Sequence, residues 1–133
     1  MIQKLYEQAK AIRKNAYAKY SNFLVGACLR TSTGEIFCGV NVENVSFPCG
    51  QCAEASAIGA MVSQLGPEAR IESLVVVGEV PEGILPCGNC LQRISEFSTG
   101  TTKIVSANLE GIQRSFTLDD LLPQRFKYER FRK

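Results

Sequence analysis

Histidine is absent from all 133 residues of the sequence. This excludes histidine-based catalytic triads, zinc sites with imidazole ligands and histidine acid–base catalysis. Any chemistry must therefore depend on cysteine, glutamate, lysine or a bound metal. The net charge is only +2, which is too small to indicate binding to nucleic acid or to an acidic membrane. No apolar run approaches a membrane span and the first residues have no signal-peptide core, so we expect a cytoplasmic protein with reduced cysteines.

The length and the 45% hydrophobic content are sufficient for one domain, residues 1–133, with a substantial core. Helical spacing of apolar residues predicts three helices, over 2–18, 53–65 and 88–97. Alternation or apolar runs predict five strands, at 23–31, 36–42, 71–80, 103–107 and 112–116. Thr117 is expected to cap a final helical turn. This order is typical of an α/β protein, a mixed sheet with helices on both faces. Residues 126–133 form a basic tail, most simply a solvated segment.

Four of the six cysteines form two Cys-x-x-Cys pairs, and three of these four stand at predicted helix starts. Cys52 precedes one helix, whereas Cys87 and Cys90 lie one turn apart at the start of another, so two helix dipoles favour thiolates there. Three thiolates can hold Zn²⁺ and keep its fourth position for water, whose pKa the metal lowers to roughly 7. Glu54 can reach that water without binding the metal, an arrangement found in zinc deaminases.

Other interpretations of these cysteines stay open at this point. With Cys49 as a fourth ligand, the two pairs could form a closed structural zinc site in a non-catalytic module. A dithiol redox pair or buried inert thiols are further alternatives. Glu54 favours the open site, because a structural site gains nothing from a carboxylate beside thiolates. Cys28 and Cys38 fall inside predicted strands and are interpreted as small core residues.

Asn41 and Glu43 end the second predicted strand. While the chain stays extended, residues two apart share one face of a strand. An amide and a carboxylate side by side suit the two hydroxyls of a sugar. A polar strand end that caps a loop explains the pair equally well.

Five segments in order resemble the small cytidine deaminases with three zinc-binding cysteines. They are residues 20–27, 39–47, 52–54, 86–90 with Gln92, and 121–126. The likeness extends from about Ala16 to Phe126. It implies a three-layer α-β-α sandwich with a five-stranded mixed sheet, assembled as a homotetramer, with a homodimer as the alternative.

The resemblance also implies a role for each matching residue. Cys52, Cys87 and Cys90 would bind catalytic zinc, and Glu54 would carry protons while water replaces the amino group at C4 of the pyrimidine. The substrate would be cytidine, 2′-deoxycytidine or a related aminopyrimidine nucleoside, converted to the uridine product and ammonia in pyrimidine salvage. Its binding residues would be Asn41 and Glu43 at the ribose hydroxyls, Phe23 at the pyrimidine ring, Ala53, and Phe126 from a neighbouring subunit.

Two departures from that family concern the charge of the metal site. Ala55 and Leu91 stand where the family has arginines that donate hydrogen bonds to the thiolate sulfurs. Three thiolates give Zn²⁺ a net charge of −1, and such outer contacts can be worth about 10–100-fold in affinity or activity. We therefore expect an alkaline-shifted pH–rate profile, unless Arg93 or Gln92 turns toward the metal.

The residue after Glu54 and the stretch 83–88 are also similar to blasticidin S deaminase. A modified cytosine nucleoside or a blasticidin-like antibiotic is therefore an alternative substrate. Asn41 and Glu43, which that enzyme lacks, favour a nucleoside.

Overall fold

The computed structural model describes residues 1–127, so the predicted basic tail lies almost entirely outside the described residues. The strands are β1 (Val25–Thr31), β2 (Ile36–Val40), β3 (Ile71–Gly78), β4 (Lys103–Asn108) and β5 (Gly111–Thr117). The helices are α1 (Ile2–Arg13), α2 (Ala53–Leu65), α3 (Gly88–Glu96) and α4 (Leu118–Leu121), with a single 3-10 turn, η1 (Phe47–Cys49). No helix in this range is long and apolar enough to cross a bilayer.

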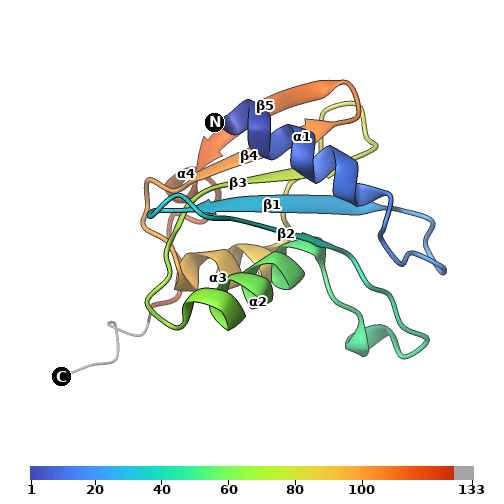
Figure 1. Cartoon of the computed structure of the whole chain (residues 1–133), viewed down its shortest axis with the longest axis horizontal. Coiled ribbons are helices and arrows are strands. Elements are labelled where there is room, and N and C mark those ends of the chain that lie inside the picture. The colour runs from blue at the N-terminus through green and yellow to red at the C-terminus, as the bar shows by residue number, and fades with distance from the viewer. Residues whose placement is uncertain (128–133) are drawn as a thin grey trace.

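The five strands form one mixed sheet in the order β2-β1-β3-β4-β5 (Figure 1). Only β3 and β4 run parallel, and the other neighbours are antiparallel. The central strand β3 is buried on both faces: Leu74 and Val76 enter one hydrophobic cluster, whereas Val75 and Val77 enter another. This is why the strand reads as a near-continuous apolar run rather than an alternation. The predicted five-stranded mixed sheet is confirmed.

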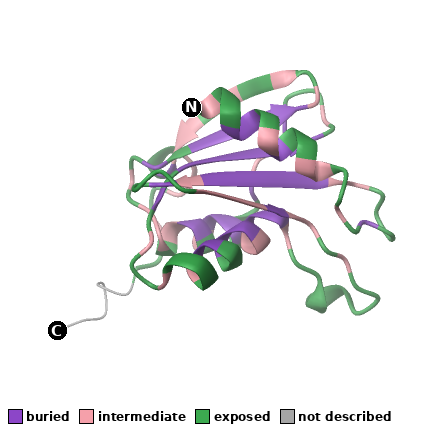
Figure 2. Ribbon diagram, viewed as in Figure 1, coloured by how far each residue is buried: buried purple, intermediate pink, exposed green. Residues whose placement is uncertain are grey.

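Helices cover both faces of the sheet, as expected (Figure 1). Helix α1 places Leu5, Tyr6 and Ala9 against one face, at the i, i+1, i+4 positions of one helical stripe. Helices α2 and α3 pack on the opposite face and bury Met61 and Ile94 completely. Figure 2 shows burial concentrated in the sheet and on the inward sides of the helices.

The first helix is shorter than predicted, because it ends at Arg13 instead of continuing to residue 18. The Tyr17 amide donates to the Asn41 carbonyl at 3.0 Å, so a tertiary hydrogen bond replaces the helical one. The Arg13 side chain also donates to the Leu24 carbonyl at 2.9 Å. Residues 14–24 therefore form a loop held against the segment that follows β2.

Cys28 and Cys38 are joined in a disulfide, which corrects the expectation that they are reduced core thiols. They lie directly opposite each other in the antiparallel β1–β2 pair, with 4.0 Å between their Cα atoms. The strand register therefore brings the two sulfurs together, and the bond ties the edge strand β2 to the interior of the sheet.

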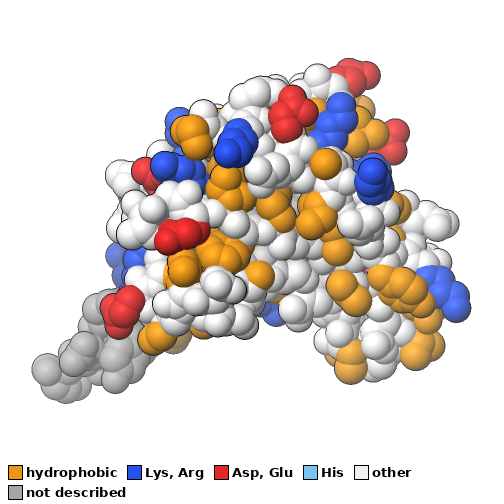
Figure 3. Space-filling model, in the orientation of Figure 1, with side chains coloured by type: hydrophobic (Ala, Val, Ile, Leu, Met, Phe, Trp, Pro, Cys, Tyr) orange, Lys and Arg blue, Asp and Glu red, His pale blue; other side chains and the backbone are white. Residues whose placement is uncertain are grey.

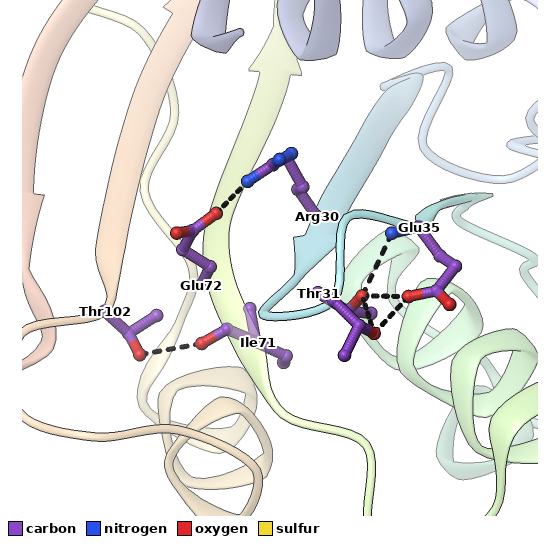
Figure 4. Close-up of polar contacts among 7 residues, drawn as sticks. Arg30, Thr31, Glu35, Ile71, Glu72 and Thr102 are labelled. Carbon is purple, nitrogen blue, oxygen red and sulfur yellow. Dashed lines mark hydrogen bonds and ion pairs between the residues drawn. The ribbon is translucent and has the colours of Figure 1, made fainter.

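Polar contacts fix the end of the sheet where β3 begins (Figure 4). The buried Thr102 hydroxyl donates to the Ile71 carbonyl at 2.9 Å. Arg30 of β1 forms an ion pair with Glu72 of β3. These contacts join β1, β3 and the residue before β4 at this end of the sheet.

Candidate metal centre and active site

Three cysteine sulfurs meet where two helices begin. Cys52 is the N-cap of α2 and Cys87 the N-cap of α3, and Cys90 lies in the first turn of α3. Their Sγ atoms all lie within 4.8 Å of one another. Tetrahedral zinc, with bonds of about 2.3 Å to sulfur, requires sulfurs about 3.8 Å apart. The cluster fits this ion after small side-chain adjustments, and it contains the three ligands predicted from the sequence.

The position of α2 depends on a close approach to β2. A Cβ atom on Gly39 of β2 would lie 2.5 Å from the Ala57 nitrogen and 2.6 Å from the Ala53 oxygen. Only glycine leaves room for the helix backbone here. Ala53 and Ala57 are buried in this contact. The close packing therefore fixes the turn that carries Cys52 and Glu54.

Glu54 lies in the first turn of α2, and only 5% of its surface is exposed. Burial raises the pKa of its carboxyl group, while a hydrogen bond with Cys90 and the charge of Arg93 act in the opposite direction. A buried carboxyl group with a raised pKa suits proton transfer near neutral pH. Glu54 is thus brought to the cysteine cluster, as the sequence predicted.

The donor set favours a cation. Burial raises the pKa of the Cys90 thiol, and the neighbouring charge of Glu54 raises it further. A bound metal ion reverses this effect, because it stabilises thiolates and deprotonates coordinating thiols. Three cysteines and one buried carboxyl group therefore fit zinc in charge as well as in distance.

Cys49 does not join the cluster. It is exposed at the end of η1, where its thiol lies 3.5 Å from the Ser46 hydroxyl. The closed four-cysteine site is contradicted, because the sulfur that it needs lies elsewhere.

Arg93 and Gln92 turn in different directions. Arg93 Nη1 donates to Cys90 Sγ at 3.8 Å, whereas Gln92 Nε2 donates to the Phe126 carbonyl at 3.3 Å. An alkaline-shifted pH–rate profile was expected unless one of these two side chains turns toward the metal. Arg93 does so, and the alkaline shift is therefore no longer expected.

Asn41 and Glu43 both face the segment 20–25, as their spacing predicted. Asn41 accepts a hydrogen bond from the Val25 amide and donates one to the Phe23 carbonyl, both at 2.9 Å. Glu43 accepts from the Tyr20 and Ser21 amides at 2.9 and 3.0 Å, and also from the Ser21 hydroxyl. These bonds lower the pKa of Glu43, and the bond from the Ser21 hydroxyl has the largest effect. Burial acts in the opposite direction. Asn41 and Glu43 thus cap the loop, as one of the two interpretations of the pair predicted. Ser21 contributes a hydrogen bond to Glu43 that the sequence reasoning missed, although Ser21 lies in segment 20–27.

A cavity of about 330 Å³ adjoins Glu43. It is lined by Tyr20, Ser21, Glu43, Asn44, Phe47 and Gly50. None of the three clustered cysteines lines this cavity. Phe23 is half-buried beside Gly78 and Ile84, and Ala53 is buried in the α2–β2 contact. Of the predicted substrate residues, all of them within the described range, Glu43 alone lines this cavity, and Phe126 is 65% exposed.

The family model for the cytidine and deoxycytidylate deaminase zinc-binding region matches residues 1–107. The chain belongs to this family. A cytidine deaminase of Sporosarcina psychrophila is 37% identical to this deaminase over 128 residues, 96% of this chain and 93% of the relative. The crystal structure of cytidine deaminase from Burkholderia pseudomallei superposes with a TM-score of 0.89 at 40% identity, covering 95% and 99% of the two chains.

Blasticidin-S deaminase of Bacillus cereus is a more distant relative of this deaminase. It is 32% identical over 110 residues, 77% of this chain and 76% of the relative. The family model, these relatives and the three clustered cysteines together confirm the predicted fold, the deaminase family and zinc as the cofactor.

Proposed function

We propose that this deaminase converts cytidine or 2′-deoxycytidine to the uridine product and ammonia by hydrolysis. The observation that carries the proposal is the cluster of Cys52, Cys87 and Cys90 with the buried Glu54 beside it. Relatives that are named cytidine deaminases and that align over nearly the whole chain support the choice of substrate. Residues 1–133 would form one domain, which is supported within residues 1–127 by two hydrophobic clusters that pack on the same sheet.

The three cysteines would hold zinc, which supplies Lewis acidity and makes water a nucleophile at neutral pH. Glu54 accepts the proton of the attacking water and delivers it to N3 of the pyrimidine. It then accepts the proton of the new C4 hydroxyl and transfers it to the 4-amino group. The C4–N bond breaks, the C4 carbonyl forms and ammonia leaves. Burial excludes bulk water from this carboxyl group, so the protons pass between the reacting atoms and Glu54.

Asn41 and Glu43 would bind the ribose hydroxyls. The Asn41 amide keeps one N–H and one lone pair beyond its two bonds within the chain. The hydrogen bonds to Glu43 lower its pKa and so keep it ionised, as an acceptor for sugar hydroxyls. Phe23 and Ala53 would contact the base. Because the Glu43 carboxylate is held in place to bind a sugar, a nucleoside substrate is favoured. A modified cytosine nucleoside or a blasticidin-like antibiotic is the second candidate.

A homotetramer would complete the site if Phe126, which is 65% exposed, enters a neighbouring subunit's site. Exposed apolar side chains support this assembly: Val45 and Phe47 are each 77% exposed on the segment after β2. Figure 3 shows hydrophobic side chains gathered on this projecting part of the molecule. Phe47→Ser should shift the sedimentation coefficient toward a smaller species and lower activity, whereas a wild-type monomer would refute the tetramer and the homodimer alike.

We also propose a place in pyrimidine salvage in the cytoplasm, with no nucleic-acid or membrane partner. Zinc binding requires Cys52, Cys87 and Cys90 as reduced thiols, which favours a reducing compartment, whereas the Cys28–Cys38 disulfide counts against one. The net charge of +2 argues against a polynucleotide substrate. Cell fractionation tests the compartment, and recovery with membranes would contradict it.

The central test combines metal analysis with ammonia release. Purified protein is assayed with cytidine, 2′-deoxycytidine, a modified cytidine and blasticidin S, alongside Cys87→Ala and the matched control Cys49→Ala. We expect one zinc per chain and turnover of the nucleosides, both lost in Cys87→Ala and both kept in Cys49→Ala. Loss of zinc in Cys49→Ala, or turnover of blasticidin S alone, would contradict the proposal.

A further inference from the structure

We propose that Arg93 is a positioning residue of the metal centre, which acts through the Cys90 sulfur to offset the negative charge of the zinc thiolates. The inference rests on the proposed zinc ligands. It assigns to Arg93 a task for which Ala55 and Leu91 have no suitable side chain.

The local helix geometry brings the two residues together. Cys90 and Arg93 are three residues apart in α3, and residues at this spacing are neighbours on a helix surface. The guanidinium donates from Nη1 to Cys90 Sγ at 3.8 Å, within the range of a hydrogen bond to sulfur. Cys90 is only 1% exposed, so this bond is formed at a sulfur that is almost completely shielded from water.

The charge of the centre explains why this contact matters. Zinc with three thiolates has a net charge of −1. Within residues 1–127, Arg93 is the cationic side chain that donates a hydrogen bond to a sulfur of the cluster. The helix N-termini contribute only about half a charge each.

The neighbouring side chains cannot take this role. Leu91 is 8% exposed and packs in the cluster beneath α3, so its position points into the core. Gln92 is neutral and bonds to the Phe126 carbonyl. In this chain an arginine three residues after the last zinc ligand therefore supplies the positive charge.

The role predicts two effects of removing the guanidinium. Zinc should bind more weakly, by about 10–100-fold, because the −1 complex loses its cation. The Cys90 thiolate should also donate more strongly to the metal, because no positively charged N–H group then withdraws its electron density. The charge-transfer absorption from thiolate to Co²⁺ in the cobalt-substituted protein should then move to longer wavelength.

The experiment compares Arg93→Gln, Arg93→Lys and the control Lys10→Gln, which removes the same charge from α1 on the other side of the sheet. The zinc dissociation constant is measured by chelator competition, the cobalt spectrum by absorption and folding by thermal melting. We expect 10–100-fold weaker zinc binding and a red-shifted band in Arg93→Gln, intermediate values in Arg93→Lys and wild-type values in Lys10→Gln.

Wild-type zinc affinity and an unshifted cobalt band in Arg93→Gln would overturn the inference and leave the proposed function standing. Zinc binding weakened to the same extent in Lys10→Gln would also overturn the inference, since zinc affinity would then depend on the net charge of the protein alone. A wild-type protein that binds no zinc would refute the proposed ligands and the inference together.

Discussion

Replacing Gly39 with alanine should disturb the active site from outside it. The added Cβ would lie 2.5 Å from the Ala57 nitrogen and 2.6 Å from the Ala53 oxygen, whereas ordinary contacts begin at 3.4 Å. The first turns of α2 and strand β2 must therefore separate by about 0.9 Å, the difference between these distances. Overpacking of this kind costs about 1–3 kcal/mol.

The same displacement should be visible in stability and in catalysis. For 133 residues, an unfolding entropy of about 2.1 cal/mol/K per residue makes 1 kcal/mol worth about 4 °C in Tm, so Gly39→Ala should melt roughly 4–11 °C lower. A shift of about 1 Å in catalytic geometry can cost about 100-fold in rate. We expect kcat for ammonia release to fall about 10–100-fold, because the shifted turn carries Cys52 and Glu54.

Gly59→Ala is the matched control in the same helix. A Cβ on Gly59 meets nothing within 4 Å. Alanine should therefore stabilise α2 by roughly 0.5–1 kcal/mol and leave kcat unchanged. Wild-type Tm and kcat in Gly39→Ala, or the same loss in both variants, would refute the close β2–α2 approach as the element that positions the site.

Three further predictions concern single side chains. Burial raises the pKa of Glu54 above 4.5 in zinc-free protein, so its effect on stability is neutral below 4.5 and becomes more unfavourable as the pH rises. Zinc-free Glu54→Gln should therefore be more stable than wild type in urea unfolding at pH 8, with a difference that shrinks toward pH 4.5; a constant difference would contradict burial as the cause. Ser21→Ala removes a donor from Glu43 and should raise KM for cytidine more than it lowers kcat, whereas an unchanged KM would remove this pair from sugar binding. Thr117→Ala removes the cap of α4, whose side chain accepts from the Asp120 amide, and should cost about 0.5–2 kcal/mol by thermal melting with unchanged kcat; full stability would contradict the cap.

Local signals in the sequence were sufficient to predict the cluster of the three cysteines proposed as metal ligands. Helix α2 spans Ala53–Leu65, the predicted range, because apolar spacing and the terminal Gly66 define both ends. The predicted cap at Thr117 is confirmed for the same reason. Three cysteines at two helix starts therefore indicated a shared centre before any tertiary contact was known.

Features that depend on contacts between distant segments were not predictable in this way. The end of α1 is set by a hydrogen bond from Tyr17 to Asn41, which helical spacing does not reveal. The Cys28–Cys38 disulfide depends on the register of β1 against β2. The sequence offers both Arg93 and Gln92 for a contact with the metal site, and only the side-chain geometry distinguishes them.

The most direct test of the account is zinc content and ammonia release in Glu54→Gln, measured on the same preparation. Glutamine keeps the size of the side chain but cannot carry the proton. We predict one zinc per chain, as in wild type, with deamination of cytidine reduced by about 10²–10⁴-fold, the usual contribution of a general acid–base group. A zinc-loaded variant with undiminished turnover would contradict the assignment of Glu54 and, with it, the proposed mechanism.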